Sequence, residues 1–480
     1  MLWNHMNMDK KVRVRFAPSP TGFLHIGGLR TSLYNYLFAK HNKGDFILRI
    51  EDTDQKRLVS DGAENILKTL KIFGLDWDEC PEYQSARLEI YKEYAQKLIE
   101  NGKAYWCACT AEHLKEMRNQ RDENKEPSKL NDPCRGLPQE GVENLIKSGA
   151  PKVLRLKVPH EGETIVEDIT HGEMKFKNEF IDDQVLLKSD GFPTYHLANV
   201  VDDHLMGITH VIRGDEWLPS TPKHVLLYQA FGWEMPKFAH LPLLLNADKS
   251  KLSKRTGDVA VEEYLKKGYL PEALLNFIAL LGWNPTADRE IYSINELIEM
   301  FNLEKVNKNG AVVNFEKLKW INGEYIKKMS SDDLAEKITP WLEKAGYKVD
   351  VEKAKGVAKL VHDRLQVFSD IGPEVSFIFQ SPNYDKSLLT WKKMEASVVP
   401  ARLAKAQEII ESIDSWTTED LERIIKERIV EEGIATGELL WPLRVALTGQ
   451  EKSPGPFEVA AVLGKEETIS RIKKAINILN

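Results

Sequence analysis

The chain has 480 residues, which is too long for one hydrophobic core and predicts several domains. Its composition is that of an ordinary globular protein, and it has no run of about 18 apolar residues, which excludes a membrane-spanning class. The net charge of −7 excludes a uniformly basic nucleic-acid-binding surface, so such a partner would have to meet a local basic region.

The amino-terminal segment Met1–Lys10 has neither the apolar core nor the cleavage pattern of a secretory signal. The whole chain holds four cysteines, too few for a disulfide scaffold and in keeping with a reducing compartment. We therefore expect a cytoplasmic protein.

The next elements alternate strands with a helix. Val12–Phe16 is expected to be a strand, Ala17–Gly22 a loop, and Phe46–Ile50 a second strand, with apolar residues at helical spacing between them. This order predicts a parallel sheet with right-handed crossovers. Ligands of such sheets bind beyond the carboxyl ends of the strands, where Ala17–Gly28 and Glu51–Asp54 lie.

The loop after the first expected strand is suited to phosphates. Residues 15–30 have the sequence RFAPSPTGFLHIGGLR, in which two prolines stiffen the chain and three glycines let the backbone approach a ligand. The following helix would offer unpaired N–H groups and a positive dipole end, and His25 a further donor. The alternative is a plain strand-to-helix turn with a surface histidine.

The pattern changes near Trp106, and residues 96–190 are expected to form an insertion in the first domain. Thr110–Lys129 is charged and prone to form a helix, whereas Val153–Val158 and Gly162–Asp168 alternate like an antiparallel pair. Ile208–Ile212, ending at Arg213, is expected to return the chain to the parallel sheet.

A cationic segment follows at residues 249–255, with the sequence KSKLSKR. Its four cations repel one another unless an anion gathers them, and a phosphate in its transition state is such an anion. Taken alone, such a loop is more often a solvated surface. Beyond it helices are expected: the apolar residues from Leu270 to Leu281 have helical spacing, with Pro271 in the first turn, and residues 331–480 are amphipathic.

The two loops together resemble the signature motifs of the class I aminoacyl-tRNA synthetases. His25-Ile-Gly-Gly28 stands where the family has His-x-Gly-His, and Lys251-Leu-Ser-Lys254-Arg255 where it has Lys-Met-Ser-Lys-Ser. The second histidine is absent, a departure found among the bacterial glutamyl-type members. Arg49-Ile-Glu-Asp-Thr-Asp54, residues 194–204 and residues 211–217 also resemble that subgroup. The resemblance implies that His25, Lys251 and Lys254 are catalytic and that ATP is held by Pro18, Ser19, Gly22, His25, Gly27, Gly28, Lys251, Ser253, Lys254 and Arg255.

Glutamate also fits on physical grounds, because two carboxylates and one ammonium call for two cations and one anion. Arg15, Arg213 and Glu51 lie at expected strand ends and supply that set, and an arginine fork binds both oxygens of a carboxylate. By resemblance, Arg213 binds the α-carboxylate, and the other glutamate contacts are Arg15, Tyr195 and Asn199 at the side-chain carboxylate, Glu51, Ala17 and Ser19 at the ammonium, and Trp217.

The resemblance also implies the architecture. We expect an α/β fold with a Rossmann-type parallel sheet, an inserted α+β connective domain and an all-α anticodon-binding half. The expected regions are 1–95 and 191–248 for the catalytic domain, 96–190 for the acceptor-stem insertion, 249–330 for the stem-contact domain, and 331–480 for the helical half. Residues 305–320 mix cations, amides and aromatics suited to an RNA backbone, and the expected tRNA contacts are Asp54, Lys305, Lys308, Lys317, Lys319 and Arg444.

A metal site is not expected. Cys107, Cys109 and Cys134 resemble the zinc knuckle of some family members, but the usual fourth position holds Gly136, and only His113 or a residue outside the motif would replace it. We therefore expect the cysteines to be free of zinc, and Mg²⁺ to accompany ATP.

The sequence thus predicts a monomeric enzyme that makes glutamyl-adenylate and transfers glutamate to tRNA(Glu), with tRNA(Gln) left open as a second substrate. Three alternatives remain. A nucleotidyltransferase acting on a small metabolite would not need the helical half or tRNA. A truncated paralogue that glutamylates a modified tRNA base would also lack that half. A non-catalytic RNA-binding module would have no reason to keep His25, Glu51 and Lys254 together.

Overall fold

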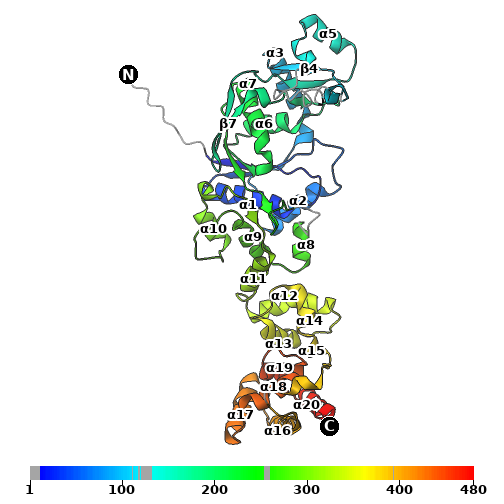
Figure 1. The fold of residues 1–480 in the computed structure, drawn as a ribbon, viewed down its shortest axis with the longest axis vertical. Coiled ribbons are helices and arrows are strands. Elements are labelled where there is room, and N and C mark those ends of the chain that lie inside the picture. Colours follow the sequence, from blue (N-terminus) through cyan, green and yellow to red (C-terminus); the bar gives the residue numbers. More distant parts are fainter. Residues whose placement is uncertain are drawn as a thin grey trace, which may run out of the picture. The chain divides into compact units, whose positions relative to one another are not determined.

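The strand, loop, helix and strand expected at the start of the chain are present (Figure 1). The two strands pair in parallel. The computed structural model describes residues 11–110, 112–116, 119, 132–252, 260–392 and 394–479. Its first sheet has the order β1-β2-β3, with β1 at Arg13–Phe16, β2 at Asp45–Ile50 and β3 at Glu82–Tyr83, all parallel. Helix α1 (Ile26–His41) connects β1 to β2. Residues 46–50 of β2 are all buried, as expected of a parallel strand that is covered on both faces.

A second sheet has the order β7-β6-β10-β9. Strands β9 (His210–Gly214) and β6 (Glu163–Asp168) are both parallel to β10 (Lys237–Leu241), and β7 (Gly172–Lys177) is antiparallel to β6. The strand expected before Arg213 is therefore confirmed. The Thr209 N–H donates to the Arg13 carbonyl over 2.9 Å, which places the start of β9 beside that of β1.

A third sheet, antiparallel with order β4-β5-β8, corrects one expected pairing. Strand β5 (Val153–Leu156) pairs with β4 (Ala104–Cys107) and β8 (Val185–Leu187), and not with β6. Both β5 and β6 alternate buried and exposed residues, which shows that one face of each is covered. Alternation does not identify the partner strand, so the expected pairing of these neighbours in sequence was wrong.

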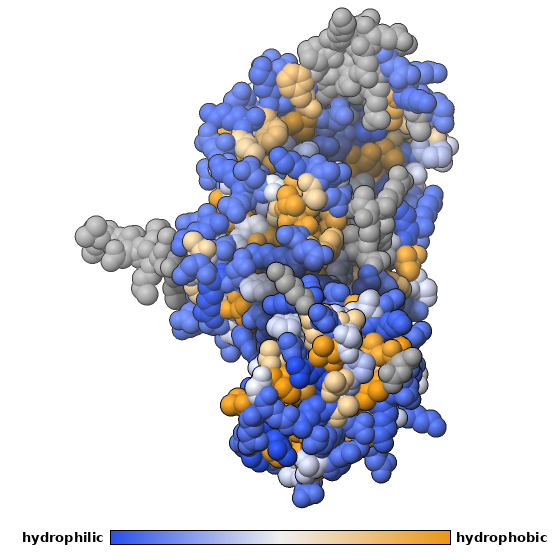
Figure 2. Space-filling view, turned by 60° about the horizontal axis from the view of Figure 1, so that its bottom comes forward, coloured by the Kyte–Doolittle hydropathy of each residue, from blue (hydrophilic) through white to orange (hydrophobic). Residues whose placement is uncertain are grey.

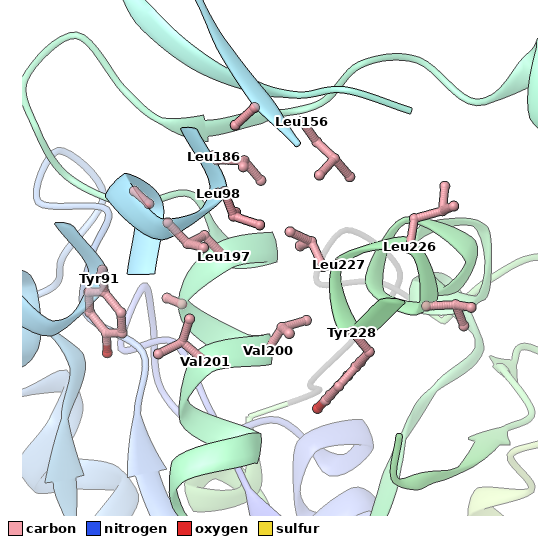
Figure 3. Packing of buried hydrophobic residues seen from close by; sticks show 14 of the residues in the cluster. Tyr91, Leu98, Leu156, Leu186, Leu197, Val200, Val201, Leu226, Leu227 and Tyr228 are labelled. Atoms are coloured by element: carbon pink, nitrogen blue, oxygen red, sulfur yellow. The ribbon is translucent and has the colours of Figure 1, made fainter. Parts of the chain in front are cut away.

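The helices α6 (Tyr195–Leu205) and α7 (Thr221–Phe231) are held by a shared hydrophobic cluster (Figure 3). Leu197, Val200 and Val201 of α6 pack with Leu227 of α7, and Leu98 of α3 (Leu88–Glu100) belongs to the same cluster. Because these apolar positions fix the rotation of α6, the polar residues of that helix occupy its other faces.

The chain divides into two compact units, Met1–Leu265 with Pro271–Phe315, and Lys266–Leu270 with Glu316–Asn480. The helix expected around Pro271 is confirmed as α9. The remaining elements of the first unit are α2 (Gly62–Ile72), α5 (Gln139–Lys147), α8 (Val261–Lys266, whose last residue belongs to the second unit), α9 (Pro271–Ala279), α10 (Ile294–Met300), β11 (Leu244–Leu245) and β12 (Ala311–Val312).

Helices form the second unit, as expected, and its described residues contain no strand. They are α11 (Phe315–Ile326, whose first residue belongs to the first unit), α12 (Ser331–Lys344), α13 (Val351–Val361), α14 (Ile371–Glu374), α15 (Ser376–Phe379), α16 (Val399–Glu411), α17 (Thr418–Glu431), α18 (Thr436–Thr448), α19 (Pro456–Leu463) and α20 (Lys465–Leu479). None of the described helices combines the length and hydropathy needed to cross a membrane. Figure 2 shows a face on which hydrophilic side chains predominate and hydrophobic ones form smaller groups.

Candidate active site

A cleft of about 580 Å³ in the first unit gathers most of the expected site residues. Its walls come from the loop between β1 and α1, from Glu51 after β2, from Tyr195 at the start of α6, from the end of β9, and from Lys251. The expected ATP and glutamate contacts that line it are Arg15, Ala17, Pro18, Ser19, Gly22, His25, Gly27, Gly28, Glu51, Tyr195, Arg213, Trp217 and Lys251.

His25 caps the amino-terminal end of α1 at one side of the cleft. Its Nδ1 accepts from the Gly28 N–H over 3.1 Å, so a neutral ring carries its proton on Nε2. A Cβ at Gly27 would lie 3.1 Å from the His25 ring, and one at Gly28 would lie 2.8 Å from the Leu24 side chain. Glycine at these positions therefore lets the loop close around His25, and at Gly28 it makes room for Leu24.

The cationic loop is only partly described. Lys251 lines the cleft, whereas Ser253, Lys254 and Arg255 lie outside the described residues, so their expected roles stay predictions. The chain on both sides belongs to the cleft region. Leu252 lines the cleft, and Ala260 forms an isolated antiparallel β-bridge with His25.

Arg213 is a buried cation surrounded by uncharged groups. Its Nε donates to His240 Nε2 over 3.0 Å and its Nη2 to Thr221 Oγ1 over 2.9 Å. Its Nη1 donates to Tyr195 Oη over 2.9 Å and to His224 Nδ1 over 3.1 Å. Arg213 is 4% exposed, and no carboxylate in the described part of the chain lies within ion-pair distance of it. Burial ordinarily requires a counter-ion for such a charge.

The histidines beside Arg213 are held neutral. Burial, together with the Arg213 charge, lowers the pKa of His224 well below its ordinary value. Burial also lowers the pKa of His240. Both imidazoles can therefore accept hydrogen bonds from the guanidinium without adding a second positive charge.

Arg15 and Arg49, on the neighbouring strands β1 and β2, have carboxylate partners. Asp203 Oδ1 accepts from Arg15 Nε over 2.9 Å and from Arg49 Nη1 over 2.8 Å, and Glu51 Oε1 accepts from Arg49 Nη2 over 3.1 Å. Burial alone would raise the pKa of Asp203, but the charges of Arg15 and Arg49 hold it below its ordinary value. Both arginines therefore have carboxylate partners before any ligand binds, and Asp202 Oδ2 is a further one at 3.9 Å from Arg49 Nε.

Asn199 lies behind the cleft rather than on its wall. Its Oδ1 accepts from Arg15 Nη2 over 3.1 Å and from Arg49 Nη2 over 3.0 Å. Because arginine only donates, the amide must turn its oxygen toward them and its NH₂ group away. Sequence reasoning named Asn199 and Arg15 but assigned no role to Arg49 or Asp203.

Two further cleft residues are Glu51 and Trp217. Burial raises the pKa of Glu51 to about 7, against the opposing charges of Arg49 and Arg15. The Trp217 ring is 36% exposed and lies with its centroid 4.2 Å from that of Tyr195. Tyr195 therefore has an aromatic neighbour on one side and Arg213 on the other.

The expected tRNA contacts are divided between the two units. Lys305 and Lys308 are exposed residues of the first unit, whereas Lys317, Lys319 and Arg444 belong to the second. Lys319 Nζ pairs with Asp370 Oδ2 at 2.9 Å. Arg444 packs over the Trp441 ring, 4.5 Å from its centroid, and donates to the Glu451 carbonyl. Asp54 in the first unit accepts from Arg57 Nε over 2.6 Å.

The cysteines form a cluster with a fourth group that sequence spacing missed. Ligand atoms of Cys107, Cys109, Asp132 and Cys134 all lie within 4.8 Å of one another. Three sulfurs and one carboxylate oxygen are a donor set that suits tetrahedral zinc. Asp132 also accepts from the Tyr105 hydroxyl and from the Cys134 N–H. Asp132 precedes the last cysteine, Cys134, whereas the usual spacing places the fourth ligand after it. The expectation of metal-free cysteines stays a prediction.

Comparisons with known proteins agree along the whole chain. The family model described as tRNA synthetases class I (E and Q), catalytic domain, matches residues 11–320, and an anticodon binding domain model matches residues 333–476. The glutamate–tRNA ligase of Clostridium tetani is 46% identical over 98% of both chains, and that of a Clostridium botulinum strain is 45% identical over 98% of this chain and 99% of its own. The crystal structure of a glutamate tRNA ligase from Elizabethkingia meningosepticum, in complex with its amino acid, has a TM-score of 0.89 at 40% identity and covers 98% of this chain and 100% of its own.

Proposed function

Because this chain belongs to the class I tRNA synthetases of the glutamate and glutamine type and acts as a glutamate–tRNA ligase, we propose that its cleft binds glutamate through Arg213 and ATP through the His25 loop. The chain would first join glutamate to AMP and then transfer the glutamyl group to the 3′ end of tRNA(Glu). ATP is the energy source of this family.

The observation that carries the proposal is the missing counter-ion of Arg213. Its guanidinium is buried, lines the cleft and donates only to neutral acceptors. The glutamate α-carboxylate supplies the absent negative charge, and it can accept from the Nη2 N–H that these four hydrogen bonds do not use. The ligand carboxylate would thus stabilise the Arg213 charge, which burial has removed from water.

The ion pairs of the site are compatible with glutamate. Arg15 and Arg49 have carboxylate partners in Asp203 and Glu51, whereas no described carboxylate lies within ion-pair distance of Arg213. Glutamate carries two carboxylates and one ammonium, hence one net negative charge. We infer that Arg15, with Tyr195, holds the side-chain carboxylate while Asn199 orients Arg15, and that Glu51, with Ala17 and Ser19, holds the ammonium.

ATP is proposed to bind at the amino-terminal end of α1. The first backbone N–H groups of a helix and its dipole attract phosphate, and His25 Nε2–H adds a donor. Mg²⁺ would accompany ATP, since this ion keeps several waters and needs few protein ligands. Among the described cleft residues Glu51 and Glu216 carry carboxylates.

The chemistry needs no nucleophile from the protein. A glutamate α-carboxylate oxygen attacks the α-phosphorus of ATP, the bond to the bridging β-phosphate oxygen breaks, and pyrophosphate leaves. A hydroxyl of the terminal tRNA ribose then attacks the activated carbonyl, loses its proton and releases AMP. The side chains hold the reactants in line, and Lys251 and Lys254 are proposed to stabilise the charge that grows on the departing pyrophosphate.

Pyrophosphate exchange with and without tRNA tests this function. Exchange should require glutamate and should increase when tRNA is added, whereas a nucleotidyltransferase acting on a metabolite would ignore tRNA. Lys254→Ala should lower turnover by about 10²- to 10³-fold and leave the KM for glutamate nearly unchanged. Lys249→Ala, an exposed cation of the same loop, is the matched control. Normal turnover in Lys254→Ala would remove its assigned role.

The choice of tRNA is a separate question. We propose tRNA(Glu) as the substrate, with the helical second unit at the anticodon, and a monomeric enzyme. Charging purified tRNA(Glu) and tRNA(Gln) side by side would show whether the second tRNA is also used. Sedimentation of the free chain would test the monomer.

A further inference from the structure

A line of buried hydrogen bonds leads from the β6–β7 hairpin to Arg213. Asp168 Oδ2 lies 2.6 Å from His240 Nδ1, and His240 Nε2 lies 3.0 Å from Arg213 Nε. All three residues are at most 4% exposed. Because water does not reach them, each polar atom must find its partner within the protein.

These contacts determine which nitrogen of His240 carries the proton. Arginine has donors only, so the Nε2 that faces Arg213 must accept, and the proton of the neutral ring is on Nδ1. The Asp168 carboxylate accepts that proton's hydrogen bond and thereby enforces this tautomer. The other tautomer would set the Nε2–H of His240 against the Nε–H of Arg213 and would turn the 3.1 Å contact with Thr221 Oγ1 from one that Nε2 can accept into one that it donates.

Asp168 is held by groups other than the His240 ring, among them the His240 backbone N–H, which donates to its Oδ1 over 3.4 Å. Its Oδ1 accepts from the backbone N–H groups of Thr170 and His171, over 2.9 Å and 3.0 Å, in the turn between β6 and β7. The N–H of Ile169, the residue after Asp168, donates to the Phe238 carbonyl of β10 over 2.8 Å. The turn therefore holds the carboxylate in place before the imidazole meets it.

The same turn makes a second contact with the cleft. His171 Nε2 lies 2.8 Å from Asp215 Oδ1, at the start of the short 3₁₀ helix Asp215–Ser220 that carries Trp217. One hairpin thus holds two elements of the glutamate pocket, the guanidinium of Arg213 through His240 and the Trp217 segment through Asp215.

We propose that Asp168 is a positioning residue for glutamate activation, which fixes the tautomer of His240 and so aims the Arg213 guanidinium at the α-carboxylate. The hairpin that carries Asp168 lies in the segment expected to contact the tRNA acceptor stem. Asp168 therefore links that segment to the amino-acid pocket. This inference rests on the proposed role of Arg213.

Asp168→Asn tests the link. Two backbone N–H groups hold one oxygen, so the new amide would turn its NH₂ toward His240 and force the opposite tautomer. The KM for glutamate should rise about 10- to 100-fold, the range seen when the outer partner of a positioned imidazole is lost. The KM for ATP should stay at its wild-type value, which general misfolding would not allow. An unchanged KM for glutamate, or an equal rise for ATP, would overturn the proposal.

Asp183→Asn is the matched control. Asp183 is 6% exposed and belongs to the same inserted region, where it pairs with Arg135 and accepts from the Tyr105 hydroxyl and the Val158 N–H. It should lower stability and leave the KM for glutamate unchanged. A comparable rise in Asp183→Asn would show that the effect of Asp168→Asn is merely structural.

Substitutions of His240 give an independent test if Asp168→Asn folds poorly. His240→Gln keeps an acceptor near the Nε2 position, whereas His240→Asn does not reach Arg213, so His240→Asn should raise the KM for glutamate more. Glutamine has no tautomers, so adding Asp168→Asn to His240→Gln should cost much less than in the wild type. The proposal would be contradicted if the rises in the KM for glutamate were additive in the double variant, or if the two His240 variants raised that KM equally.

Arg213→Ala separates this inference from the function on which it rests. If Arg213→Ala leaves the KM for glutamate unchanged, the proposed role of Arg213 fails. If Arg213→Ala raises that KM and Asp168→Asn does not, only the positioning role of Asp168 fails.

Discussion

Three of the buried arginines in and beside the cleft form two groups that differ in their partners. Arg15 and Arg49 lie against the carboxylates of Asp203 and Glu51. Arg213 instead donates to two imidazoles and two hydroxyls, with no carboxylate in ion-pair distance among the described residues. Both groups lie at the ends of parallel strands, so topology alone does not separate them.

The difference separates charges that belong to the fold from a charge that awaits a ligand. A buried ion pair is complete without substrate, and breaking it leaves an uncompensated charge inside the protein. A buried guanidinium among neutral acceptors is well oriented but lacks a counter-ion. Removing the shared carboxylate of the first group, Asp203, should therefore damage stability, and removing Arg213 should damage binding.

The largest expected effect is on the first group. Asp203→Asn removes the negative charge that faces both Arg15 and Arg49, and should lower the free energy of unfolding by about 3–5 kcal/mol. Urea denaturation would measure it. The control Asp45→Asn breaks partly exposed pairs with Lys11 and Arg13 and should cost about 1 kcal/mol. Similar small losses of unfolding free energy in both variants would contradict the structural role of the Asp203 ion pairs.

Arg213→Met should show the reverse pattern. Its free energy of unfolding should fall less than that of Asp203→Asn, while the KM for glutamate rises about 100-fold, because a hydrogen bond to a charged group is worth about 1.5–3 kcal/mol. Added glutamate should raise the Tm of the wild type and have little effect on the variant. A variant that is unstable but still binds glutamate normally would place Arg213 with the structural group.

Glu51 takes part both in the fold and in the proposed ligand binding, because it pairs with Arg49 and is proposed to bind the glutamate ammonium. Its pKa of about 7 means that it gains a proton as the pH falls through that value, so the KM for glutamate should rise by at most about tenfold per pH unit below it. The folded-state pKa lies above the ordinary 4.5, so the stability contributed by protonated Glu51 is full below pH 4.5 and lost as the pH rises through about 7. Glu51→Gln should remove both dependences, and unchanged profiles in that variant would exclude this titration.

The smallest effect is expected at a partly exposed cation. Lys319→Ala loses its pair with Asp370, and stability should change by less than about 1 kcal/mol. If Lys319 contacts tRNA, the KM for tRNA should rise a few-fold, and its dependence on salt should weaken by about one phosphate contact. Lys337→Ala, an exposed lysine of α12, serves as the control. Equal salt dependence in both variants would remove Lys319 from the interface.

The sequence predicted the parts of the site that follow from local order. The strand, loop and helix around His25, and the strand ending at Arg213, were found because their periodicity and turn residues are local. Arg15, Glu51 and Arg213 were named because topology brings strand ends together. The partners Asp168 and Asp203 were missed, since a buried aspartate that meets a side chain far along the chain has no local signature. The same holds for Asp132 and for the pairing of β5.

The central claim is that the glutamate α-carboxylate is the counter-ion of Arg213. The most direct measurement is calorimetric titration of the wild type and of Arg213→Met with L-glutamate and with its α-amide, which lacks that charge. We expect the wild type to prefer glutamate by about 100-fold and the variant to bind both ligands with nearly equal, weak affinity. If Arg213→Met keeps the full preference for glutamate, the α-carboxylate is held elsewhere and the account is wrong.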